Sequence, residues 1–164
     1  MRLFVAIQFT DEIKDSLTGV LHDLKTQGVG GKYTPKQNMH LTLAFIGERR
    51  DPDEVKTVLA SVPFKPFKLG IAESGNFGNL IWAGVKGNQK LKTYVRDLRA
   101  ALDAAGIPYD KKEFVPHITL IRDASSSKPF KAAVPRQEMM VKKISLMKSE
   151  NKNGRMVYTE IWHN

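Results

Sequence analysis

The sequence predicts an α+β fold of two similar lobes, each an antiparallel-rich sheet packed by helices, with an approximate two-fold axis around a central cleft. Strand-like and helix-like segments alternate along the 164 residues. The segment His40-Leu41-Thr42-Leu43 returns as His117-Ile118-Thr119-Leu120, 77 positions later. The same offset, without a gap, superposes the strand, helix and loop before each segment. We therefore treat 1–164 as one domain of two intertwined, repeat-related lobes.

The first repeat is predicted to contain a strand, a helix, a loop and a second strand. Residues 3–9 are apolar and aromatic with little alternation, as in a strand that is covered on both sides. Thr10 suits the N-cap of an amphipathic helix over 11–27, and glycines then end that helix. A loop over 33–38 leads into the first motif strand, 39–46.

The rest of the chain follows the same alternation. A short helix that ends near Ser61 separates the repeats, and the second repeat places its helix between Asn88 and about Gly106. Residues 123–135 are rich in Ser, Lys and Pro and predict an exposed loop. The remaining strands are predicted at 67–72, 80–85, 115–121, 140–147 and 156–162, with a hairpin turn at 150–154.

Basic side chains outnumber acidic ones. The chain holds 26 Lys and Arg against 17 Asp and Glu, a net charge of +9, which favours polyanionic partners. It has no cysteine, which excludes disulfides, thiolate nucleophiles and thiolate metal ligands. The N-terminal apolar run is too short for a signal peptide, and no stretch approaches the ~20 apolar residues of a membrane span. We therefore expect a soluble, cytoplasmic protein.

The two His-x-Thr segments are the candidate site. Alternate side chains of a strand share a face, so His40 and Thr42 point away from the core that Leu41 and Leu43 join. The second copy repeats this arrangement. A single histidine on a strand is more often structural, but core packing does not need the same polar pair twice at equivalent positions. A two-fold axis would place the two polar faces opposite each other.

Two histidines that face each other suit proton transfer. An unperturbed pKa of ~6.5 makes both protonation states available near neutral pH, and neighbouring hydroxyls can donate to phosphate oxygens. In-line displacement at phosphorus requires the attacking and leaving oxygens on opposite sides, which a two-fold axis supplies. The arrangement therefore indicates a phosphodiester. A zinc site is the weaker alternative, because His22 and His163 form no ligand spacing with this pair.

With these motifs the chain resembles the 2H phosphoesterase superfamily, and within it the RNA 2′,3′-cyclic phosphodiesterases, historically called 2′-5′ RNA ligases. The resemblance runs from the opening Met-Arg-Leu-Phe-Val-Ala-Ile through His-Leu-Thr-Leu-Ala-Phe-Ile-Gly-Glu and Val-Pro-His-Ile-Thr-Leu-Ile-Arg to Ile-Ser-Leu-Met-Lys-Ser and Val-Tyr. It implies a metal-independent enzyme, without a cofactor, that opens a 2′,3′-cyclic phosphate at an RNA 3′ end and leaves a 2′-phosphate.

The resemblance also implies roles for single residues. His40 would be the proton donor to the departing 3′ oxygen, and His117 the proton acceptor that activates water. Thr42 and Thr119 would hold the non-bridging oxygens. Arg122 matches a family arginine that binds the phosphate, yet strand parity places it on the face opposite His117. It can join the site only if the strand ends or bulges near Ile121.

Aromatic and basic side chains suggest how RNA would be held. Phe9 and Tyr33 are candidates for stacking on a terminal base, although Phe9 also suits the core. Phe45 and Trp82 are further aromatic candidates, but strand parity places Phe45 in the core and Trp82 is expected there too. Lysines of the two equivalent loops could line the rim of the cleft: Lys32, Lys36, Lys111 and Lys112.

Other functions remain open at this point. The same site could join tRNA halves through a 2′-5′ bond, or hydrolyse another cyclic phosphate or a 2′-5′ oligonucleotide. A protein of another class would bind RNA ends without catalysis, although paired acid and base groups are unnecessary for binding. The expected partner is RNA with a 2′,3′-cyclic end or a small cyclic nucleotide. We expect a monomer, with no membrane and no partner protein.

Overall fold

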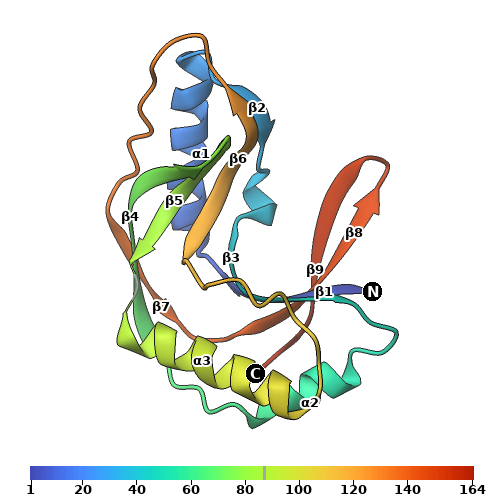
Figure 1. Ribbon diagram of the computed structural model, residues 1–164. Coiled ribbons are helices and arrows are strands. Elements are labelled where there is room, and N and C mark those ends of the chain that lie inside the picture. The colour runs from blue at the N-terminus through green and yellow to red at the C-terminus, as the bar shows by residue number, and fades with distance from the viewer. Residues whose placement is uncertain (87) are drawn as a thin grey trace.

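The computed structural model describes residues 1–86 and 88–164 and confirms the α+β class (Figure 1). The elements are β1 (Arg2–Gln8), α1 (Asp11–Thr26), β2 (Gly30–Tyr33), the 3₁₀ helix η1 (Lys36–Asn38), β3 (His40–Glu48), α2 (Asp53–Ser61), β4 (Phe67–Phe77), β5 (Leu80–Lys86), α3 (Gln89–Ala104), β6 (His117–Ser125), β7 (Gln137–Val141), β8 (Ser145–Lys152) and β9 (Arg155–His163). In the described residues they form two antiparallel sheets, ordered β3-β1-β8-β9 and β2-β6-β5-β4-β7.

The two motif strands have equivalent neighbours on one side, although β3 is an edge strand and β6 also pairs with β2. β3 pairs with β1, and β6 pairs with β5, each in antiparallel register. On their other sides, β1 pairs with β8 and β5 pairs with β4. The helices that follow β1 and β5 are both capped as predicted, because Thr10 Oγ1 accepts from Ile13 N at 3.3 Å and Asn88 Oδ1 from Leu91 N at 2.8 Å.

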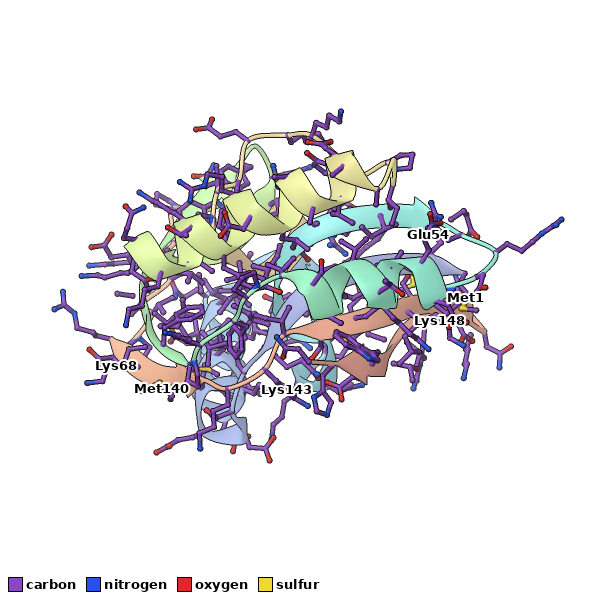
Figure 2. All side chains as sticks on the ribbon, turned by 90° about the horizontal axis from the view of Figure 1, so that it is seen from below. Met1, Glu54, Lys68, Met140, Lys143 and Lys148 are labelled. Atoms are coloured by element: carbon purple, nitrogen blue, oxygen red, sulfur yellow. The ribbon has the colours of Figure 1, made fainter. Side chains whose placement is uncertain are left out.

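The helices bury their apolar stripes in a core that both sheets share. Figure 1 shows α1 alongside the five-stranded sheet. The buried faces of α1 and α3 belong to the same hydrophobic cluster. Figure 2, seen from below, shows α2 and α3 side by side. A second, small cluster of Phe4, Ala6 and Met147 lies on the other face of the four-stranded sheet. None of the helices in the described part of the chain has the length and hydrophobicity of a membrane span.

The chain before each motif strand bonds to the opposite motif strand. Thr34 N, directly after β2 on the way to β3, donates to Leu120 O of β6 at 2.9 Å, and Asp110 N, between α3 and β6, donates to Phe45 O of β3 at 2.8 Å. Arg99 of α3 adds a second connection, because its guanidinium donates to Lys112 O at 2.7 Å and to Leu43 O at 3.4 Å. β3 and β6 therefore lie next to each other although they belong to different sheets.

Three predictions of secondary structure were wrong. The single strand expected at 140–147 is two strands in different sheets, β7 and β8, with 142–144 outside either strand. The expected loop at 33–38 overlaps the end of β2, which was not predicted. The strand expected at 67–72 is longer than predicted, because β4 continues to Phe77 before the hairpin to β5 closes.

Candidate active site

Both motif strands contain a β-bulge at the same repeat position. In β3, Thr42 pairs with Ala6 and Ala44 with Val5, so Leu43 has no counterpart. In β6, Thr119 pairs with Trp82 and Ile121 with Ile81, so Leu120 has none. A bulge adds one residue, and the side chains beyond it therefore change face. Leu43 and Leu120 are related by the 77-residue offset, so both strands change face at the same point.

The bulges bring two further side chains onto the histidine face. Leu43 and Ala44 are both buried, and so are Leu120 and Ile121. The next side chains, Phe45 and Arg122, point outward from the core, and they too are separated by the 77-residue offset. The prediction that Phe45 is core was wrong, because its side chain is 51% exposed. The bulge that Arg122 required is present, and its exposed side chain lies on the face of His117.

The His40 ring is held by two hydrogen bonds. Nδ1 lies 2.7 Å from the carbonyl oxygen of Asn38, and Nε2 lies 2.8 Å from Thr42 Oγ1. A carbonyl only accepts, so Nδ1 carries the proton, and in the neutral ring Nε2 accepts from the threonine hydroxyl. His117 repeats the first contact, with Nδ1 2.6 Å from Val115 O. Both rings are therefore oriented by the carbonyl two residues earlier.

Each imidazole is also flanked by two aromatic rings. The edge of Tyr158 meets His40 at 5.2 Å between centroids and 89°, while Phe4 lies tilted at 4.9 Å. The second lobe matches this arrangement, with Phe77 at 5.2 Å and 86° from His117 and Trp82 tilted at 6.5 Å. Aromatic contacts of this kind restrict ring orientation without offering a competing proton acceptor. They therefore add to the hydrogen bonds that orient the two imidazoles.

Charges from both lobes act on His40. Burial lowers the pKa of His40 to about 4, against the opposing effect of the hydrogen bond to the Asn38 carbonyl. The positive charges of Arg122, His117 and Lys14 also contribute to this low pKa. His40 is therefore neutral in the free protein near pH 7. The same cations form a positive environment that favours an anionic substrate.

The low pKa of His40 predicts that acid destabilises the protein. Between pH 6.5 and about 4 the unfolded chain binds a proton on this imidazole and the folded chain does not. The contribution to stability is therefore complete above pH 6.5, and about 2–3 kcal/mol of it is lost as the pH falls to 4. Urea unfolding at pH 7 and pH 4.5 should show a larger acid-dependent loss for wild type than for His40→Gln. Equal losses in both proteins would contradict the burial of a neutral His40.

The other predicted site residues lie in different surroundings. Phe9 is 5% exposed within the core, so it is withdrawn as a base-stacking candidate. Tyr33 is half-buried on β2, where its hydroxyl donates to Val29 O and its ring contacts the Lys25 ammonium of α1. Its contact with a base stays a prediction. Trp82 is half-buried beside His117 rather than in the core.

The lysines expected at the rim each pair with a carboxylate. Their partners are Asp123 for Lys32, Asp15 for Lys36, Asp103 for Lys111 and Asp110 for Lys112. Exposed pairs of this kind contribute little to stability, but they reduce the positive charge available to RNA. The described residues contain no cluster of three His, Asp or Glu that could hold a metal ion.

Sequence reasoning missed several residues around His40. Gln8, the cross-strand neighbour of His40, donates to Ser145 Oγ at 3.1 Å and to Glu160 at 2.6 Å. Glu160 also accepts from Ser145 and Lys143, and these bonds lower its pKa against the effect of burial. The alternation along β1, which places Phe4, Ala6 and Gln8 on one face, was the available signal. Nothing in the sequence indicated their partners on β8 and β9.

Comparisons with known proteins agree with this fold. A family model described as the 2′-5′ RNA ligase superfamily matches residues 6–153. An RNA 2′,3′-cyclic phosphodiesterase of Archaeoglobus fulgidus is 33% identical, over 74% of this chain and 72% of the relative. The enzyme of that name from Thermotoga maritima is 30% identical, over 74% and 70%. A crystal structure of Escherichia coli LigT complexed with 3′-AMP superposes with a TM-score of 0.84 at 26% identity, covering 99% of this chain and 95% of that one.

Proposed function

Because the chain belongs to the 2′-5′ RNA ligase superfamily, we propose that it hydrolyses the 2′,3′-cyclic phosphate at an RNA 3′ end to a 2′-phosphomonoester. The main support is the pair of motif strands. Each presents a histidine whose Nδ1 donates to a carbonyl, and His117 and Arg122 lie close enough to His40 to lower its pKa. Two imidazoles, each with its Nδ1 bonded to a main-chain carbonyl, near one guanidinium suit an anionic phosphodiester.

The reaction needs one water and two proton transfers. A water oxygen forms a bond to phosphorus as the bond from phosphorus to the 3′ oxygen breaks, opposite the incoming water. One imidazole takes a proton from the water, and the other gives a proton to the departing 3′ oxygen. The product carries a 2′-phosphate and a 3′-hydroxyl. Thr42, Thr119 and Arg122 are proposed to bind the non-bridging oxygens, whose charge increases in the transition state.

We assign His40 as the proton donor and His117 as the acceptor. The support is the asymmetry between the lobes: Phe45 stands on the strand of His40, at the place that Arg122 holds in the other lobe. A base on Phe45 would put its ribose, and hence the leaving 3′ oxygen, on the side of His40. Since His40 is neutral in the free protein, it must take up a proton with the substrate, whose negative phosphate raises its pKa.

Phe77 favours a second candidate reaction. Its ring is 45% exposed and meets His117 edge-on, on the side where water would enter. A nucleoside stacked there would present its 5′-hydroxyl in place of water, and attack would then form a 2′-5′ bond. Adding a 5′-hydroxyl oligonucleotide to the hydrolysis reaction tests this candidate. The RNA substrate, the monomeric state and the cytoplasmic location stay predictions.

Product analysis tests the proposed hydrolysis. RNA with a 2′,3′-cyclic phosphate is incubated with the protein in EDTA, and the phosphorus-containing products are identified by ³¹P NMR. We expect a 2′-phosphomonoester. A 3′-phosphomonoester would show that the bond from phosphorus to the 2′ oxygen breaks instead. Tight binding without turnover would indicate a protein that only binds RNA ends.

Phe45 is expected to determine how well the terminal base binds. Base stacking on an aromatic side chain contributes ~1–3 kcal/mol, so Phe45→Ala should raise KM for a nucleoside 2′,3′-cyclic phosphate ~10-fold, with kcat changed less. Phe130, another exposed phenylalanine, lies in the loop before β7. Phe130→Ala serves as the control and should leave KM unchanged. An unchanged KM in Phe45→Ala would remove Phe45 from the substrate site.

A further inference from the structure

Among the described residues, the two buried polar side chains both connect to the surroundings of His40. In the described residues, Asn38 is 6% exposed and Ser145 is fully buried. Ser145 bonds Gln8, the cross-strand neighbour of His40, and Asn38 precedes His40 by two residues. Burying a polar group costs stability unless its bonds are made. The position of both residues therefore points to the histidine rather than to the core.

Asn38 links β9 to the His40 ring. Its Nδ2 donates to Met156 O of β9 at 2.9 Å, and its main-chain oxygen accepts from His40 Nδ1 at 2.7 Å. The main-chain N–H of Asn38 donates to Pro35 O at 2.9 Å, which closes the turn of η1. The carbonyl that receives the imidazole proton is thus fixed from both sides. The same strand, β9, also supplies Tyr158, which packs edge-on against His40.

The second lobe lacks this anchor. Val115 holds the position equivalent to Asn38, and its carbonyl also accepts from a histidine Nδ1, that of His117. The Val115 side chain is 42% exposed and cannot hydrogen-bond a neighbouring strand. Each histidine therefore has the same main-chain contact, but of the two carbonyls only that of Asn38 belongs to a residue whose side-chain amide is bonded to another strand.

We propose that Asn38 is a positioning residue, whose amide holds the carbonyl that keeps the proton on Nδ1 of His40 and directs Nε2 toward Thr42 and the phosphate. A neutral imidazole in the other tautomer would carry its proton on Nε2, and its Nδ1 lone pair would then face the Asn38 carbonyl oxygen, which cannot donate. Fixing the tautomer through the opposite nitrogen is a common use of such bonds. The catalytic part of this inference rests on the proposed function, whereas the tautomer does not.

Two variants and one control test the proposal. Asn38→Val introduces the side chain of the equivalent position, and Asn38→Ala removes the amide without adding bulk, should the valine variant fail to fold. Asn88→Ala is the control, because Asn88 Nδ2 also donates to a main-chain carbonyl, that of Lys68, at 2.9 Å. Figure 2 shows Lys68 at the outer edge of the molecule. Asn88→Ala should lower the melting temperature, since it also removes a helix cap, yet leave kcat unchanged.

The readouts separate positioning from folding. At pH 7, ¹⁵N-histidine NMR should show His40 of wild type with a protonated Nδ1 and an unprotonated Nε2, and an average of both tautomers in the Asn38 variants. His40→Gln identifies the signals of this residue among the four histidines. With a 2′,3′-cyclic phosphate, kcat of the Asn38 variants should fall ~10-fold or more while KM stays within about twofold.

Two results would overturn the proposal. One is a wild-type tautomer of His40 in both Asn38 variants. The other is a loss of kcat in Asn38→Ala that is no larger than the loss in Asn88→Ala, when the two variants are equally stable. An inactive wild-type protein would instead refute the proposed function, and the NMR comparison would still decide whether Asn38 fixes the ring.

Discussion

His40→Ala and His117→Ala are each expected to lower kcat/KM for an RNA 2′,3′-cyclic phosphate by ~10²–10⁴-fold, because each removes one of the two proton transfers. Initial rates in EDTA, with folding checked by thermal unfolding, measure the effect. The double variant should be little slower than the worse single variant, since residues that act in one step are not additive. Full activity in either single variant would exclude the two-histidine mechanism.

The pH profile of kcat/KM should be bell-shaped, but it cannot assign the roles. Its acid limb is expected well below the 6.5 of a free imidazole, since burial lowers the pKa of His40 to about 4. The state with a proton on His40 alone and the state with a proton on His117 alone bind the same number of protons, so both assignments give one profile.

A substrate with sulfur in place of the bridging 3′ oxygen separates the roles. A thiolate leaves without a proton, so loss of the proton donor matters less with this substrate. His40→Ala should therefore recover ~10-fold or more relative to wild type, while His117→Ala should recover nothing, because the water must still lose its proton. Recovery in His117→Ala alone would reverse the assignment of donor and acceptor.

Arg122→Met is expected to lower kcat/KM ~10–10²-fold. A charge-assisted hydrogen bond contributes about 1.5–3 kcal/mol, and the guanidinium meets a phosphate oxygen whose charge increases in the transition state. Arg122→Lys keeps the charge but loses the planar pair of donors, so it should recover only part of the activity. The assay compares the variants at low ionic strength, where surface charges are least screened.

Arg136→Met is the matched control for Arg122. Arg136 is also exposed and lies in the loop before β7. Its substitution by methionine removes the same charge from the protein as Arg122→Met. It should leave kcat/KM nearly unchanged. Equal losses in the two variants would mean that Arg122 acts only through the overall charge of the protein.

The sequence was sufficient for the motif strands and the helices. Hydrophobic spacing and capping residues located α1 and α3, and the duplicated His-x-Thr pattern located β3 and β6. These features are local, because a side-chain period or a cap depends on residues a few positions apart. The same rules could not locate Phe45, since strict alternation holds only until a strand gains an extra residue.

The bulges and the short strands depend on distant partners. Leu43 is unpaired because Val5 and Ala6, which are adjacent in β1, pair with Ala44 and Thr42 of β3. The glycines of β2 were predicted only to end the first helix, yet this segment forms a strand that pairs with β6. Gly31 is required there, because its φ is +137° and a Cβ would lie 2.7 Å from the Ile121 side chain. β7 and β8 were predicted as one strand because 140–147 offers no turn residue.

The main-chain hydrogen bonds that Thr34 and Asp110 donate to the opposite motif strands bear on how such a chain could arise. Each comes from the approach to one motif strand and satisfies a carbonyl of the other, at Leu120 and Phe45. A half-length polypeptide would leave those carbonyls without partners and would hold a single imidazole. An ancestor of that size would have needed an identical chain to complete its site, so joining the two copies in one gene would have made an obligate homodimer independent of concentration.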